Sequence, residues 1–211
     1  MKAIDHPSRR LAEILLAIAC LSCSASGATT NLPCIADTFI VSSAPDNNAG
    51  ADTGNTVGRD NATGVRRTLL RFDLTGIPAG ATVLAAELRQ QVTREPPLRV
   101  DSTFTIHRLL AAWGEGSKTS SFPGNNGSPA TANEATWNSR LHGTALWTTP
   151  GAMADAVSVP SASTPIAGVG LYSWSGTGLT ADVQLWIDHP GSNFGWLVKS
   201  DNESTGKTAR E

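Results

Sequence analysis

The sequence predicts an all-β fold, an antiparallel β-sandwich of the jelly-roll type with one short helix. Three observations support this prediction. Apolar and polar residues alternate along several short segments, which is typical of strands that bury only one face. The 211 residues include 20 Gly and 12 Pro, which favour turns and interrupt long helices. One segment, residues 179–188, instead has the three–four apolar spacing of a helix.

Five segments carry the strand pattern, and the alternation also assigns their faces. In residues 68–74, Leu70, Phe72 and Leu74 share one face, while Arg71 points to the other. The predicted strands are residues 38–41, 68–74, 82–93, 103–107 and 194–199. The side chains that we expect in the core are Leu70, Phe72, Leu74, Ile106 and Trp186.

Two further stretches complete the predicted domain, which spans residues 29–211. Residues 111–170 are rich in Gly, Asn, Ser, Thr and Pro, and we predict a long loop-rich excursion there. Residues 179–188 place Leu179, Val183 and Ile187 on one side of a helix, which should end before a Pro-Gly pair.

The N-terminus has the pattern of a secretory signal peptide, which we assign to residues 1–28. Basic residues near the start are followed by the apolar stretch 14–21 and then by small residues up to Ala28. The apolar stretch is too short for a membrane span, so we expect a secreted protein without one. A lipid anchor at Cys20 or Cys23 is the alternative.

Charge and cysteine content exclude several classes of protein. There are 16 Lys and Arg against 18 Asp and Glu, so the chain lacks the basic excess of a nucleic-acid-binding protein. Removal of residues 1–28 leaves Cys34 as the single cysteine, which rules out an intramolecular disulfide and a thiolate zinc site. We expect a monomer.

The sequence favours a protein without catalytic activity and without a cofactor. It lacks the metalloprotease, serine-hydrolase and phosphate-loop motifs. A glycosidase needs two carboxyl groups about 5–10 Å apart, and Glu115 and Glu134 both lie in the excursion. A small glycan hydrolase that uses this pair is therefore retained as an alternative function.

Tryptophan is over-represented, with six Trp against one Tyr. We expect Trp186 and Trp196, on the helix and a strand, to be buried. An exposed indole ring offers a flat apolar face on which a sugar ring can stack. The candidate ligand-binding residues, which lie in or beside the excursion, are Trp113, Glu115, Trp137, Trp147 and Trp174.

The Asp- and Asn-rich segment 46–61 is a candidate calcium-binding loop, because calcium prefers hard oxygen ligands. Its candidate ligands are Asp46, Asp52 and Asp60. The same residue types populate turns for backbone reasons alone, and the spacing matches no EF-hand. A structural calcium ion and a metal-free turn both remain open.

Several short motifs, in order along the chain, resemble the DNRLRE-domain family. They are residues 36–40, 67–74, 77–81, 113–116, 135–137, 147–151, 182–186 and 193–196. The resemblance implies a β-sandwich module of secreted or surface proteins, with relatives classed as carbohydrate-binding modules attached to polysaccharide-degrading enzymes. It implies non-catalytic binding of an extracellular polysaccharide or cell-surface glycan. A structural or adhesive surface module without sugar specificity is the alternative.

The C-terminal end departs from that family pattern. The resemblance implies a Ser-Arg-Glu motif followed by a last strand, whereas this sequence has Ala209, Arg210 and Glu211 at its end. We therefore expect the last strand of the sandwich to be missing, which would leave backbone groups of its neighbour unpaired.

Overall fold

The computed structural model describes residues 27–60, 64–121 and 126–211. The predicted signal peptide, with Cys20 and Cys23, lies almost entirely outside these ranges. Residues Asn31–Glu211 form one compact unit, which contains all the elements named below. No helix within the described ranges combines the length and apolar content needed to cross a membrane.

The main sheet contains six antiparallel strands, and most neighbours are distant in sequence, as in the predicted jelly roll. Strand β4, in the interior of the sheet, pairs with three others. In spatial order the strands are β1 (Cys34–Val41), β4 (Gly64–Phe72), β12 (Trp196–Ser200), β6 (Ser102–Arg108) and β10 (Ala162–Ile166), with β3 (Gly58–Asp60) also beside β4.

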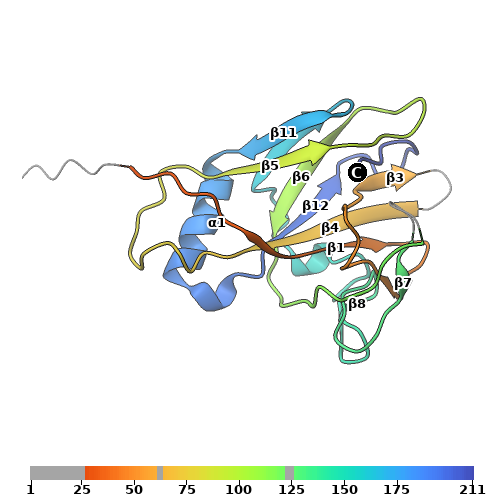
Figure 1. Ribbon diagram of the computed structural model, residues 1–211, viewed down its shortest axis with the longest axis horizontal. Coiled ribbons are helices and arrows are strands. Elements are labelled where there is room, and N and C mark those ends of the chain that lie inside the picture. Colours follow the sequence, from red (N-terminus) through yellow and green to blue (C-terminus); the bar gives the residue numbers. More distant parts are fainter. Residues whose placement is uncertain (1–26, 61–63, 122–125) are drawn as a thin grey trace, which may run out of the picture. The chain divides into compact units, whose positions relative to one another are not determined.

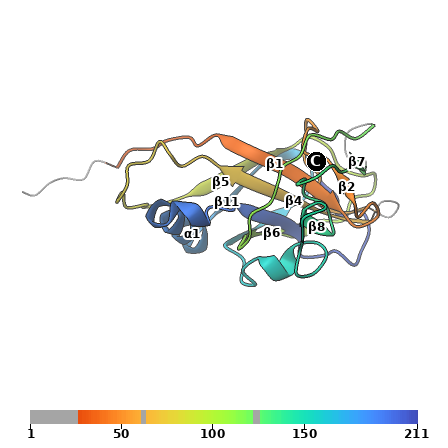
Figure 2. The same ribbon diagram turned by 90° about the horizontal axis from the view of Figure 1, so that it is seen from below.

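One face of the main sheet is covered by a second layer, so the predicted all-β sandwich is confirmed. This layer contains β5 (Glu87–Val92), its antiparallel partner β11 (Gly170–Ser175) and helix α1 (Thr177–Asp188). Helix α1 starts two residues before the predicted segment and lies at the opposite end of the strands from β7 and β8 (Figures 1 and 2). The core between the layers includes Leu70, Leu88, Phe104, Ile106, Trp174, Leu179, Trp186 and Trp196.

The excursion covers the other face of the main sheet. Its short elements are β7 (Ser128–Pro129), β8 (Ser139–Leu141), β9 (Ala145–Leu146) and the 3-10 turn η1 (Met153–Asp155), and β7 pairs with β2 (Asn47–Asn48). A second 3-10 turn, η2 (Pro190–Ser192), follows α1. The second core contains Ala36, Ile40, Leu69, Leu109, Trp113, Ala135, Trp147 and Leu197. Because Leu69 and Leu70 are both buried, β4 is covered on both faces.

Several sequence predictions need correction at their boundaries. The excursion is shorter than residues 111–170, because β10 and the start of β11 are strands; Pro165 fits β10 because β10 is an edge strand. Phe72 and Leu74 are only partly buried, since they lie at and beyond the end of β4, whereas Leu70, Ile106 and Trp186 are buried as predicted.

The strand predicted over residues 82–93 begins only at Glu87. Upstream of it, side chains of α1 replace a neighbouring strand as hydrogen-bond partners of the backbone. Gln184 Oε1 accepts the Val83 N–H at 2.8 Å, and Thr180 Oγ1 accepts the Ala86 N–H at 3.2 Å.

Asp182 fastens α1 to the main sheet. Its carboxylate accepts hydrogen bonds from Arg108 Nε at 2.9 Å and from Trp196 Nε1 at 2.8 Å, as well as from the Ser161 hydroxyl. Asp182 itself is buried, and the Trp186 and Trp196 rings pack with centroids 4.5 Å apart. The helix is thus held to the main sheet by the hydrogen bonds of Asp182 and by the packing of Trp186 on Trp196.

The last described residues lie between two other segments. Arg210 forms a bridge with Val57, and the backbone of Glu211 exchanges hydrogen bonds with that of Arg94, just beyond β5. The buried Arg210 guanidinium donates to the carbonyl oxygens of Val100 and Ala167. Within the described residues β5 pairs with β11 as its strand partner.

Candidate functional site

Five of the six Trp side chains are buried, among them three of the four candidates for sugar stacking. Trp113, Trp147 and Trp174 are at most 4% exposed. Their indole N–H groups donate to the main-chain carbonyl oxygens of Phe194, Thr136 and Phe104, respectively. Stacking of a ligand on these three rings would require them to leave the core. Trp137 is the candidate that is partly exposed.

Trp137 is held against the main sheet by Arg67 of β4. The Arg67 Cζ atom lies 5.1 Å from the centroid of the indole, which is a cation–π contact. Arg67 Nε and Nη2 donate to the two carboxylate oxygens of Glu203 at 2.9 and 2.7 Å, and Nη1 donates to the Gly151 carbonyl. A Cβ atom on Gly151 would lie 2.8 Å from the indole, so this contact requires glycine.

The strand register places two more polar side chains on the same face of the main sheet as Arg67. Leu197 of β12 lies opposite Leu69 on one side and opposite His107 on the other. Two positions further along, Lys199 lies opposite Thr105 of β6. The pairing of β12 with β4 ends at Val198 and Thr68, and Lys199 and Arg67 are the next residues on the two neighbouring strands. We call the resulting group the sheet-end shelf; its five partly exposed members are Arg67, Thr105, Trp137, Lys199 and Glu203.

His107 lies beneath the sheet-end shelf and is buried. Its Nδ1 atom is 2.9 Å from the Val157 carbonyl oxygen, and its Nε2 atom is 3.0 Å from Thr105 Oγ1. Burial lowers the pKa of His107, as do the nearby positive charges of Lys199 and Arg67, and these effects outweigh the Val157 carbonyl and Glu203. The imidazole is therefore neutral at pH 7.

Sequence reasoning singled out Trp137 but none of the other members of the sheet-end shelf. Arg67 and Glu203 are 136 residues apart, and the remaining members come from two further strands. The alternation along β4 places Arg67 on the same face as Arg71. It does not indicate which loop covers that face.

The two carboxylates of the hydrolase alternative both bind backbone amides. Glu115 Oε1 accepts the Asp37 N–H at 2.9 Å, which satisfies a donor on edge strand β1. The buried Glu134 accepts the N–H groups of Thr131 and Ser117 at 2.6 and 2.9 Å. Burial raises the pKa of Glu134, but the hydrogen bonds from Thr131 and Ser117 lower it by more, so it lies below its ordinary value.

We expect Glu134→Gln to destabilise the excursion at neutral pH and to remove part of the acid sensitivity of folding. A lowered pKa in the folded state stabilises the fold fully above the ordinary value of 4.5, and this contribution is lost as pH falls through the lowered pKa. Urea denaturation at neutral pH and below pH 4.5 should show a difference between wild type and variant that shrinks on acidification. The exposed Asp188→Asn, on the solvent side of α1, is the control, and an unchanged difference would contradict the assignment.

Two of the three candidate calcium ligands, Asp46 and Asp52, accept hydrogen bonds from another loop. Asp46 Oδ1 accepts the side-chain amide of Asn138 at 3.0 Å. Asp52 accepts both the N–H and the hydroxyl of Ser120 at 2.6 Å, and Asp60 ends β3. Throughout the ranges that the structure describes, no group of three or more His, Cys, Asp and Glu side chains is placed to hold a metal ion.

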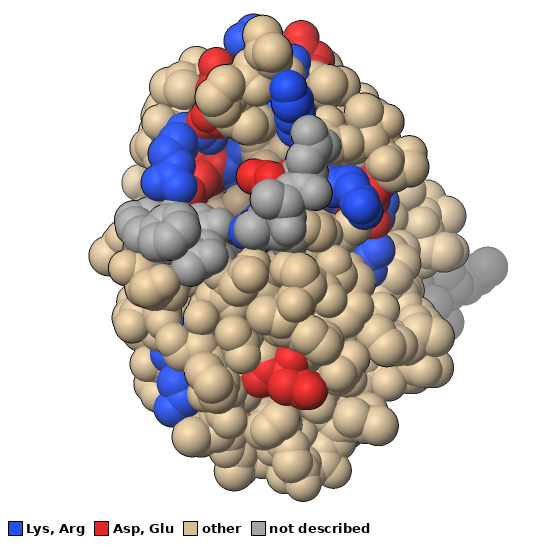
Figure 3. Space-filling model, turned by 90° about the vertical axis from the view of Figure 1, so that its right-hand side faces the viewer, with Lys and Arg blue, Asp and Glu red and all other residues tan. Residues whose placement is uncertain are grey.

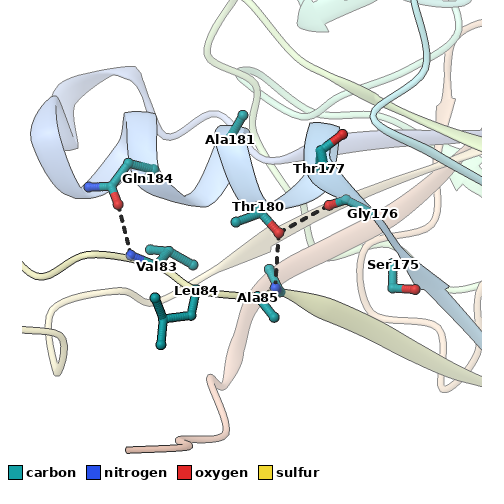
Figure 4. Close-up of a pocket in the computed structure, with 10 residues that line it drawn as sticks. Val83, Leu84, Ala85, Ser175, Gly176, Thr177, Thr180, Ala181 and Gln184 are labelled. Atoms are coloured by element: carbon teal, nitrogen blue, oxygen red, sulfur yellow. Dashed lines mark hydrogen bonds between the residues drawn. The ribbon is translucent and has the colours of Figure 1, made fainter. Parts of the chain in front are cut away.

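A shallow groove between residues 83–86 and α1 is the second surface feature considered (Figure 4). None of its ten lining residues is aromatic. Thr180 and Gln184, which line it, accept backbone N–H groups of the facing segment, and the Thr180 hydroxyl also donates to the Gly176 carbonyl at the start of α1. The groove therefore offers a sugar neither a stacking face nor many free hydrogen-bonding groups, and the sheet-end shelf is the better candidate.

Charged groups are unevenly distributed on the end of the molecule seen in Figure 3. Lys, Arg, Asp and Glu side chains are intermixed in its upper half, whereas the lower half is almost free of them. The lower half corresponds to the region of β7 and β8 in Figure 1. Between residues 119 and 154 the charged residues are Glu134, which is buried, and Arg140. The excursion thus presents mainly hydroxyl, amide and small side chains.

Comparison with known proteins identifies a family. A family model described as carbohydrate-binding module family 96 matches residues 28–153. This range includes Arg67, Thr105 and Trp137, while Lys199 and Glu203 follow it. Comparison with curated proteins gives no match. Because the family model covers more than half of the 211 residues, the chain belongs to carbohydrate-binding module family 96.

Proposed function

We propose that this carbohydrate-binding module is secreted and binds an extracellular polysaccharide, without catalysis, at the sheet-end shelf. The observation that carries the proposal is the partly exposed Trp137 ring held between the sheet and the excursion, with Arg67 and Glu203 beside it. Aromatic rings and planar hydrogen-bonding groups together match the apolar faces and the hydroxyl groups of a sugar.

The polar groups around Trp137 are ordered before any ligand binds. Arg67 is fixed by both oxygens of Glu203 and by the Gly151 carbonyl, so a sugar that contacts its remaining donor positions would order little further. Lys199 and Thr105 extend the row of polar groups across β12 and β6. This preorganisation favours a binding function for the sheet-end shelf.

Secretion and the lack of catalysis are supported separately. The signal-peptide pattern of residues 1–28 supports export. The engagement of Glu115 and Glu134 by backbone amides supports a structural role for both carboxylates. The resemblance to the DNRLRE-domain family agrees with a β-sandwich that binds glycans.

Affinity gel electrophoresis against neutral and uronate-containing polysaccharides tests the proposal. We expect the purified protein to be retarded by at least one of them, and Trp137→Ala and Lys199→Ala to lose the retardation. Because Trp137 also packs against the second core, thermal melting must show that the variants remain folded. Leu84→Ser, in the groove beside α1, is the matched control and should bind as the wild type does, since Leu84 is 78% exposed.

Each contrary outcome points to a different function. Binding that survives in both shelf variants would overturn the assignment of the site, and binding lost in Leu84→Ser would move it to the groove. Adhesion to surfaces that is independent of glycans would favour an adhesive module. Release of sugars from a polysaccharide, abolished by Glu134→Gln, would favour the hydrolase.

A further inference from the structure

The hydrogen bonds of His107 fix which of its nitrogens carries the proton. The Val157 carbonyl oxygen, 2.9 Å from Nδ1, can only accept a hydrogen bond, so Nδ1 must carry the hydrogen. In a neutral imidazole the other nitrogen then has a lone pair. Nε2 therefore accepts the hydroxyl hydrogen of Thr105, whose Oγ1 lies 3.0 Å away.

This tautomer determines what Thr105 offers to the surface. Its hydroxyl hydrogen points inward to Nε2, so Oγ1 presents lone pairs on the side of the sheet-end shelf. Lys199, which lies opposite Thr105, and Arg67, on the next strand, carry donors only. The Thr105 oxygen is thus an acceptor in a row with two cationic donors.

We propose that His107 is a positioning residue that holds the Thr105 hydroxyl as an acceptor for a sugar hydroxyl, and that binding weakens when the imidazole gains a second proton. The proposal rests on the function proposed for the sheet-end shelf. A proton on Nε2 would be donated to Thr105 Oγ1, and the hydroxyl hydrogen would turn outward to the Lys199 carbonyl, 3.5 Å away, or to the shelf.

The charged groups around His107 act in both directions, and each of the two cations has a larger effect on its pKa than the carboxylate. Lys199 of β12 and Arg67 of β4 oppose a positive imidazole, Glu203 favours it, and the excursion contributes the neutral Val157 carbonyl. Because burial and the two cations lower the pKa of His107 from its ordinary value of 6.5, the second proton binds only below that pH.

Binding measured from pH 8 to pH 5 tests the proposal, with the polysaccharide that retards the wild type as the probe. The wild type should bind equally well at pH 8 and 7 and more weakly as the pH falls below 6.5. Thr105→Val should bind about fivefold more weakly at pH 8, the effect of one hydrogen bond, and lose the pH dependence. Thr105→Ser should restore both the affinity and its pH dependence. His107→Gln should bind independently of pH. His142→Gln, outside the shelf, should keep the wild-type profile.

Three results would overturn the proposal, two from binding and one from NMR. One is Thr105→Val binding as tightly as the wild type at pH 8, and another is a pH dependence that persists in folded His107→Gln. Nitrogen NMR of the imidazole gives a readout that needs no polysaccharide, since a hydrogen on Nε2 at pH 8 would also overturn it. Loss of the proposed function would show instead as a folded wild-type protein that binds none of the polysaccharides.

Discussion

Phe104→Ala should lower the free energy of unfolding by about 3–5 kcal/mol, as expected when a large aromatic side chain is removed from a packed core. Phe104 is fully buried between the main sheet and the β5–β11 layer, in contact with the first core. Its carbonyl also accepts the Trp174 indole N–H at 2.8 Å, which fixes β11 over β6. Equilibrium urea denaturation, followed by Trp fluorescence, measures the loss.

Phe72→Ala is the matched comparison, because the same side chain is removed from a partly exposed position at the end of β4. Its loss should be clearly smaller than that of Phe104→Ala. Equal losses in the two variants would mean that the burial assigned to the two phenylalanines is incorrect.

Asp182→Ala should destabilise the protein by about 3 kcal/mol, because it leaves Arg108 without its buried ionic partner. It also removes the acceptor of the Trp196 indole N–H and of the Ser161 hydroxyl. Together with Arg108, three donors are then left without the carboxylate that accepted their hydrogen bonds. Thermal melting and urea denaturation should both register the change, with the near-ultraviolet signal of the Trp186–Trp196 pair altered.

Asp188→Ala, on the exposed side of the same helix, serves as the control and should change stability little. Asp182→Asn should fall between the two, since an amide oxygen can still accept one of the hydrogen bonds but carries no charge for Arg108. An Asp182→Ala protein that is as stable as Asp188→Ala would show that the network does not hold the helix.

Alternation of apolar and polar residues located β4, β5 and β6. It did not reveal that β4 is buried on both faces, because the segments that cover Leu69 come from the excursion. β10 was missed because its Ser, Thr and Pro residues carry no apolar period, and only its edge position makes Pro165 acceptable. The helix was predictable from Leu179, Val183 and Ile187, but the partner of Asp182 was not, since Arg108 comes from a distant strand.

The sequence indicated which residue types form the candidate site, but not which individual residues lie together in it. An excess of Trp indicated aromatic contacts but could not separate the rings that pack from the one that is partly exposed. Three of the buried rings donate their indole N–H to backbone carbonyl oxygens and a fourth donates to Asp182, and the acceptors of the three lie in other segments. Arg67 and Glu203 meet only because the chain after β12 returns to the start of β4.

The excursion separates residues that maintain the fold from residues that meet the solvent. Asn48, which is fully buried, binds the carbonyl oxygens of Glu115 and Ala135 and the N–H groups of Gly50 and Lys118. Trp113, Trp147 and Glu134 also point inward. The outward Ser, Thr, Asn and Ala side chains of the excursion contribute few such anchors, so evolution can replace them at little cost to folding. Two descendants of one ancestor could therefore keep these anchors, and with them the fold, while diverging in the sugars that they recognise.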